Sequence, residues 1–153
     1  MNAVNLNMVK FSGVEISDDL LFLFLNFSKT IIRFAYASNF NCKRFAIKES
    51  FSVKHLKLSR CQNLSELLID KVNEHLETVD LAECPLMTVA VLKPLLDFCP
   101  NLSELNISET AVSDAELDAL KTEYPCVNFI SKKIKNSPYF FYAIGGNIVE
   151  EAL

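Results

Sequence analysis

The sequence predicts an α/β fold: a short solenoid of about six repeats with a parallel sheet on its concave face and helices on its convex face. Its 153 residues suit one domain, and half of them are hydrophobic, which is enough for a continuous core. A short apolar pattern recurs along the chain, and helix signals lie between its copies. We expect the solenoid over residues 1–135 and a C-terminal cap over residues 136–153.

The recurring pattern reads apolar-x-x-apolar-x-apolar-x-x-Cys/Thr, and each copy is expected to begin with a strand. The clear copies are 53–61, 76–84 and 102–110, and the fainter ones are 6–14, 31–39 and 124–132. Their second apolar positions are Val9, Phe34, Leu56, Val79, Leu105 and Val127. These positions are separated by 22 to 26 residues, within the range of roughly 20–29 typical of such repeats.

Helices are expected between the strands. The segment 16–19 is an N-cap signal before apolar residues at helical spacing, up to residue 27. The segment after Asn39 is the least regular, and we expect a loop or a short helix there.

Three further segments carry helical patterns. One stripe is formed by Leu64, Leu67, Leu68 and Val72. A second stripe runs over residues 86–96, with Pro94 expected to interrupt it or to restart a short turn. Ser113 and Glu116 then fit a capping box before Leu117 and Leu120.

The segment 99–107, together with Cys84 and the stretch 112–114, resembles the cysteine-containing class of leucine-rich repeats, known from F-box/leucine-rich-repeat proteins and related adaptors. The resemblance extends from Leu6 to about Lys132 and implies a scaffold that binds other proteins. Val14 and Lys132 depart from the Cys/Thr position of the pattern, which suggests irregular terminal turns.

The cysteines and histidines do not suggest catalysis or metal binding. No Cys-x-x-Cys pair occurs among the five cysteines, and His55 and His75 lack metal-ligand spacing. We expect Cys61 and Cys84 to point into the turns and to bond backbone carbonyls. The chain is therefore expected to be no enzyme and to hold no cofactor or metal.

Composition narrows the partners and the compartment. A pI near 5.2 argues against nucleic acid as a partner. Uninterrupted apolar runs reach only six residues, too few to cross a membrane, and the start lacks a targeting signal. An odd number of cysteines without a disulfide pattern is typical of a reducing compartment, so we expect a cytoplasmic protein.

The strand residues that point away from the core form the candidate binding surface, because side chains alternate between the faces of a strand. Its candidate partner-binding residues are Lys10, Arg33, His55, Lys57, Asp80, Glu104 and Asn106. Charge changes sign along this surface: residues 1–75 carry ten basic and seven acidic side chains, and residues 76–153 carry five and twelve. One interpretation is ordinary surface polarity with Lys57 and Asp80 paired; the other is a bipolar surface that orients a partner protein.

Two functions remain open. The first is a non-catalytic adaptor or scaffold that binds a partner protein through the concave face. The alternative is a substrate-recognition subunit of a ubiquitin ligase, with a degenerate F-box at residues 16–45 that binds the ligase adaptor. The segments 16–21 and 42–45 are similar to the two ends of an F-box, and this alternative requires residues 31–36 to be helical.

Overall fold

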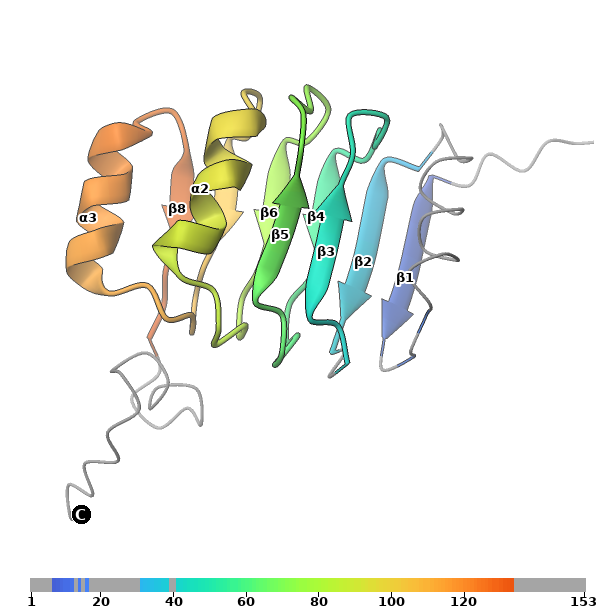
Figure 1. The fold of residues 1–153 in the computed structure, drawn as a ribbon, viewed down its shortest axis with the longest axis horizontal. Coiled ribbons are helices and arrows are strands. Elements are labelled where there is room, and N and C mark those ends of the chain that lie inside the picture. The colour runs from blue at the N-terminus through green and yellow to red at the C-terminus, as the bar shows by residue number, and fades with distance from the viewer. Residues whose placement is uncertain (1–6, 13, 15, 17–30, 39–40, 134–153) are drawn as a thin grey trace, which may run out of the picture.

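The computed structural model describes residues 7–12, 14, 16, 31–38 and 41–133. These residues form two layers, one behind the other in Figure 1. One layer is a six-stranded parallel sheet, and the other contains a two-stranded parallel sheet and two helices. The predicted α/β class with a parallel sheet is confirmed.

The six-stranded sheet follows the order of the chain, and each of its strands lies in one copy of the sequence pattern. All five neighbouring pairs are parallel. The strands are β1 (Met8–Ser12), β2 (Arg33–Ala37), β4 (His55–Lys57), β6 (Thr78–Asp80), β7 (Glu104–Asn106) and β8 (Asn128–Ile130). Since a parallel connection must return across the fold, the chain between successive strands from β2 onward builds the second layer.

The pairing register confirms five of the six predicted core positions and corrects the last. Leu105 is paired with Phe129 and not with Val127, so the sixth copy of the pattern is displaced by two residues. The buried side chain is the larger aromatic, with 9% of Phe129 exposed, whereas Val127 is only partly buried. A displacement of two residues keeps every side chain on its expected face, because strand side chains alternate with a period of two.

A left-handed turn follows four of these strands at the same place. Its residues have φ between 57° and 63°, and they are Ser38, Arg60, Glu83 and Glu109. This conformation is unfavourable for residues other than glycine. Each backbone N–H donates to a carbonyl of the next copy, and the acceptors are Ser59, Ala82, Ser108 and Lys132. Lys132 is thus equivalent to Ser108, and its predicted place at the Cys/Thr position is wrong.

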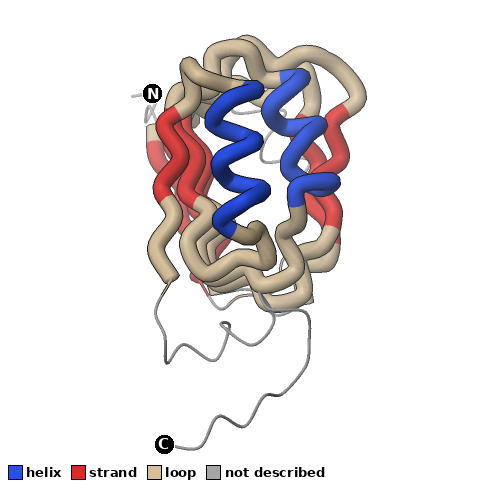
Figure 2. The backbone as a smooth tube through the Cα atoms, turned by 90° about the vertical axis from the view of Figure 1, so that its left-hand side faces the viewer, coloured by secondary structure: helices blue, strands red, loops and turns tan. Residues whose placement is uncertain are grey.

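The second layer contains β3 (Arg44–Ile47), β5 (Glu66–Ile69), α2 (Val89–Phe98) and α3 (Asp114–Glu123). In Figure 1, β3 and β5 lie in front of β4 and β6, and α2 follows next to β5. Figure 2 views the molecule from the side that carries the helices, with strands on both sides of them. The buried apolar side chains of both layers belong to one core cluster.

Two expectations for this layer are wrong. The predicted helix along Leu64, Leu67, Leu68 and Val72 is the strand β5 with its flanking turns, and the segment after Asn39 contains the strand β3. The paired positions are 22 and 23 residues apart where the second layer is extended, and 26 and 24 residues apart where it is helical. A strand rises about 3.3 Å per residue and a helix about 1.5 Å, so an extended segment crosses the layer with fewer residues.

The helices in the C-terminal half agree better with the sequence. The Ser113 side chain accepts a hydrogen bond from the Glu116 backbone N–H at 3.3 Å, and the Glu116 carboxylate accepts one from the Ser113 N–H at 2.8 Å. This confirms the capping box of α3. Pro94 lies inside α2 and does not interrupt it. Residues 17–27 of the predicted N-terminal helix and the whole C-terminal cap lie outside the described residues.

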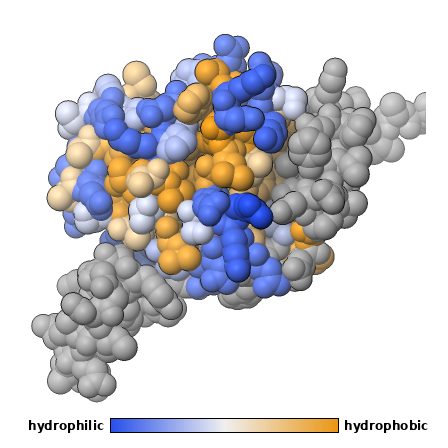
Figure 3. Space-filling view, viewed as in Figure 1, coloured by the Kyte–Doolittle hydropathy of each residue, from blue (hydrophilic) through white to orange (hydrophobic). Residues whose placement is uncertain are grey.

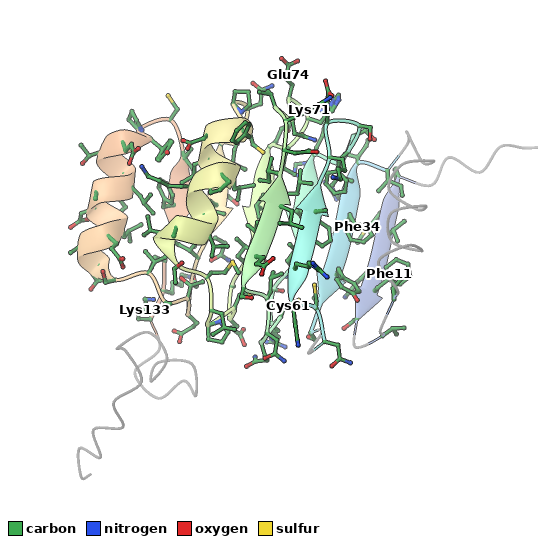
Figure 4. The ribbon with its side chains drawn as sticks, in the orientation of Figure 1. Phe11, Phe34, Cys61, Lys71, Glu74 and Lys133 are labelled. Atoms are coloured by element: carbon green, nitrogen blue, oxygen red, sulfur yellow. The ribbon has the colours of Figure 1, made fainter. Side chains whose placement is uncertain are left out.

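Aromatic side chains connect the two layers near β1 and β2. The Phe11 and Phe34 rings lie 6.1 Å apart, and Phe45 of β3 lies 6.3 Å from Phe34. Figure 4 shows Phe11 and Phe34 side by side on their strands. Within the described residues, no helix is both long enough and apolar enough to span a bilayer.

Candidate protein-binding surface

The outer face of the six-stranded sheet, which points away from the second layer, contains all seven predicted partner-binding residues. The register aligns them in two rows across the strands. The first row is Met8, Arg33, His55, Thr78, Glu104 and Asn128, and the second is Lys10, Ala35, Lys57, Asp80, Asn106 and Ile130. The shift in β8 places Asn128 and Ile130 where the sequence suggested Cys126 and Asn128.

A shallow hollow of about 250 Å³ opens on this face over β1, β2, β4 and β6. We call it the Ala35 hollow, because Ala35 lies between Lys10 and Lys57 in the second row and leaves space between two long side chains. The outward residues that line it are Met8, Arg33, Ala35, His55, Lys57, Thr78 and Asp80. The sequence shows a small residue at position 35 but does not reveal that its neighbours enclose a depression.

Three ion pairs join the copy containing β4 to the copy containing β6. The Lys57 ammonium lies 3.2 Å from the Asp80 carboxylate, in the middle of the sheet. The other two pairs flank it, Lys54 with Glu77 at 2.8 Å and Arg60 with Glu83 at 3.2 Å. The basic half of the chain thus meets the acidic half along one boundary, and much of the charge there is internally compensated.

Three of the candidate residues have partners that fix their side chains. His55 Nδ1 lies 2.9 Å from the Thr78 hydroxyl on the next strand. Asp80 accepts the Ala82 backbone N–H at 3.0 Å, and Asn106 accepts that of Ser108 at 3.1 Å. Asp80 and Asn106 therefore also stabilise the turns at the ends of their strands, a role that the sequence analysis missed.

The remaining charges on the outer face are Lys10, Arg33 and Glu104. Within the part of the chain that the structure describes, these three side chains make no hydrogen bond or ion pair. Lys10 and Arg33 lie on β1 and β2, and Glu104 lies three strands further, on β7. The charge available to a partner is therefore positive at one end of the face and negative towards the other.

The cysteines at the Cys/Thr position serve the backbone, as predicted. The Cys61 thiol donates to the Tyr36 carbonyl at 3.4 Å, and the Cys84 thiol donates to the Leu58 carbonyl at 3.2 Å. Figure 4 places Cys61 close to one end of the strands. Burial raises the pKa of the Cys84 thiol well above its ordinary value and that of Cys99 to about 11. Both thiols therefore remain protonated at neutral pH, and a neutral thiol is a poor nucleophile.

One structural residue gave no sequence signal. Asn73 is fully buried, and its amide donates to the carbonyls of Lys48 and Phe51 at 2.9 and 2.8 Å. Its side-chain oxygen accepts the backbone N–H groups of His75 and Leu76, both at 3.0 Å. Asn73 thus connects neighbouring copies of the pattern. Within the described ranges, no group of three or more His, Cys, Asp or Glu side chains is placed to hold a metal ion.

The opposite surface of the molecule, formed by the second layer, has a different character. Figure 3 looks onto this surface and shows apolar side chains gathered between polar ones. Leu68 of β5 and Phe98 at the end of α2 are 45% and 36% exposed. This surface is a natural control for any binding experiment on the outer face.

The chain has distant similarity to known proteins. Two Arabidopsis thaliana sequences, both described as "Disease resistance protein RPS6", are 29% identical to it over 101 residues. The match covers 65% of this chain and 8% of the length of each relative, so the chain corresponds to a small part of them. No family model matches the chain, and no solved structure matches it.

Proposed function

We propose that the chain is a non-catalytic leucine-rich-repeat module of about six repeats that binds another protein through the outer face of its six-stranded sheet. In this proposal the outer face is the concave side of the solenoid. Repeat scaffolds offer such extended surfaces for recognition. The observation that carries the proposal is the Ala35 hollow, with Arg33 and Lys10 uncompensated by any described residue.

The distribution of charge supports an oriented complex. Three strand spacings of about 4.8 Å separate β2 from β7, so Arg33 and Glu104 lie roughly 14 Å apart across the face. A partner with complementary charges at that separation would bind in one direction and be disfavoured in the reverse one. Complementary charge contributes to specificity and to the rate of association more than to affinity.

The similarity to a disease resistance protein supports a role in recognition. The five cysteines are all free, which supports action in a reducing compartment such as the cytoplasm. We therefore propose an adaptor or scaffold, and we include no nucleic acid or membrane among its partners.

The ubiquitin-ligase alternative loses its main structural requirement. An F-box over residues 16–45 needs a helix at residues 31–36, whereas Arg33–Ala37 forms the strand β2. Phe45 lies on the strand β3, fully inside the core. We expect the ligase adaptor not to bind the purified chain in a pull-down experiment, and stoichiometric binding would restore this alternative.

The proposal is tested with a partner recovered by co-purification, identified by mass spectrometry and then purified separately. Glu104→Trp places a bulky side chain in the outer face, and Asp118→Trp makes the same change on an exposed position of α3. We expect Glu104→Trp to raise the dissociation constant about tenfold or more, and Asp118→Trp to leave it unchanged. The reverse result would move the binding site to the second layer.

A further inference from the structure

We infer that the Ala35 hollow receives an acidic side chain, an aspartate or a glutamate, of the partner protein. This inference rests on the proposed function and identifies the chemistry of the partner. Two observations support it: the shape of the hollow, and the absence of a partner for Lys10 and Arg33 among the described residues.

The hollow suits a single side chain. Its volume of about 250 Å³ is open to solvent on the outer face, and Ala35 is among the residues that line it. Arg33 precedes Ala35 on the same face of β2, and Lys10 and Lys57 lie on either side of it in the row. The lining itself contains two cationic side chains, Arg33 and Lys57, and one carboxylate, that of Asp80, which is paired with Lys57. A short group that ends in a negative charge can therefore approach Arg33, with Lys10 next to Ala35 in the row.

Lys57 and His55, which both line the hollow, already have partners. Lys57 is paired with Asp80, and His55 is hydrogen-bonded to Thr78. Lys10 and Arg33 have no such partner among the described residues. An arginine guanidinium can donate two parallel hydrogen bonds to one carboxylate, which adds geometric specificity to the attraction of charge. Arg33 is therefore the expected main contact.

The hollow also offers apolar contact. Met8, which is 51% exposed, and Ala35 both line it. The methylene groups of a glutamate, or a small apolar residue next to the acid, can pack on these atoms. A thioether side chain adapts to partners of different shape.

The surrounding charges favour an acidic peptide over a nucleic acid. A phosphate backbone is bound by a continuous row of cations. Here the cations without a partner among the described residues, Lys10 and Arg33, lie on β1 and β2, and the carboxylates of Asp80 and Glu104 follow on β6 and β7. The whole chain also carries a net charge of -4, which disfavours a long polyanion.

The test uses random linear peptides displayed on phage and selected on the intact chain. Enriched peptides are then synthesised with a fluorescent label, and their affinity is measured by anisotropy. We expect enrichment of aspartate or glutamate at one position. We expect Arg33→Glu to weaken binding about tenfold or more, because it removes the paired donors and places a like charge next to the acidic side chain.

A matched control and two further variants sharpen the result. Lys121→Glu makes the same change to an exposed cation on α3 and should leave the affinity unchanged. Arg33→Lys should recover part of the loss, because it restores the charge but not the paired donors. Ala35→Leu fills the hollow and should also weaken binding. Thermal unfolding of each variant shows whether it is folded, and Arg33→Glu is sufficient if Ala35→Leu does not fold.

Failure of the inference can be told apart from failure of the proposed function. Peptides that lose affinity to Glu104→Trp but show no acidic preference and tolerate Arg33→Glu would overturn the inference alone. Peptides that tolerate both substitutions would overturn both. A selection without any enriched peptide would also overturn the inference. The inference would also be overturned if a single-stranded RNA displaced the peptides and its binding were lost in Arg33→Glu.

Discussion

The ammonium group of Lys57 lies 3.2 Å from the carboxylate of Asp80 on the neighbouring strand, where the basic half of the chain meets the acidic half. The two side chains are 54% and 27% exposed, so the pair contributes less than about 1 kcal/mol to stability. Its main consequence is for binding, because it leaves Lys10, Arg33 and Glu104 as the uncompensated charges of the outer face in the described part of the chain.

Asp80 has a second role that can be separated from its charge. Its other carboxylate oxygen accepts the Ala82 backbone N–H at 3.0 Å, and Asn106 does the same for Ser108. We expect Asp80→Asn to change the free energy of unfolding by less than about 0.5 kcal/mol, since the acceptor is retained. Asp80→Ala should cost about 1 kcal/mol in urea unfolding. Equal losses in the two variants would show that the charge matters more than the turn.

Asn73 should be the most sensitive polar residue of the core. It makes four side-chain hydrogen bonds to the backbone and is fully buried. We expect Asn73→Ala to destabilise the chain by about 3 kcal/mol or more, because it leaves several buried backbone groups unsatisfied. The control is Asn101→Ala, which removes one exposed hydrogen bond to the Glu74 carbonyl and should cost about 1 kcal/mol or less. Similar losses at both positions would contradict this assignment.

Stability should fall in alkaline solution. Burial raises the pKa of Cys84 and of Cys99 above the ordinary value of 9.0, for Cys99 to about 11. The folded chain therefore keeps these protons when the unfolded chain releases them, so the free energy of unfolding decreases as the pH rises above about 9. Urea unfolding at a series of pH values above 9 measures how steeply the free energy of unfolding falls with pH. The double variant Cys84→Ser/Cys99→Ala should show a shallower fall. A slope that is the same without the two thiols would contradict this cause.

The reactivity of the cysteines should differ sharply. Cys126 is exposed, whereas Cys61, Cys84 and Cys99 are buried. We expect a thiol reagent such as DTNB to modify Cys126 rapidly in the folded chain and the three buried thiols only on unfolding. Cys126→Ser should remove most of the fast phase. A fast phase that persists and maps to Cys61 or Cys84 would show that the turns at the end of the sheet open readily.

The sequence predicted the six-stranded sheet well, because its signal is repeated. Val9, Phe34, Leu56, Val79 and Leu105 occupy the same rung of the sheet. The capping box of Ser113 and Glu116 was equally readable, since both partners lie within one turn of chain. The prediction for the last strand was wrong by two residues, because Val127 and Phe129 both fit an alternating apolar pattern.

The second layer was predicted less well for a physical reason. The apolar run over residues 67–69 is too short for its periodicity to distinguish a strand from a helix. The distance between pattern copies carried the missing information, since the shorter intervals contain β3 and β5 and the longer ones contain α2 and α3. The Ala35 hollow and the hydrogen bonds of Asn73 depend on which strands lie side by side in space. A pattern of residue types does not report such contacts.

Photo-crosslinking from two single positions tests the central claim most directly. A photoreactive amino acid replaces Thr78, in the middle of the outer face, or Ala46, which is partly buried on β3 in the second layer. Each variant is mixed with the purified partner and irradiated. The proposed binding mode predicts a crosslinked complex from position 78 and none from position 46. A complex that forms from position 46 and not from position 78 would contradict it.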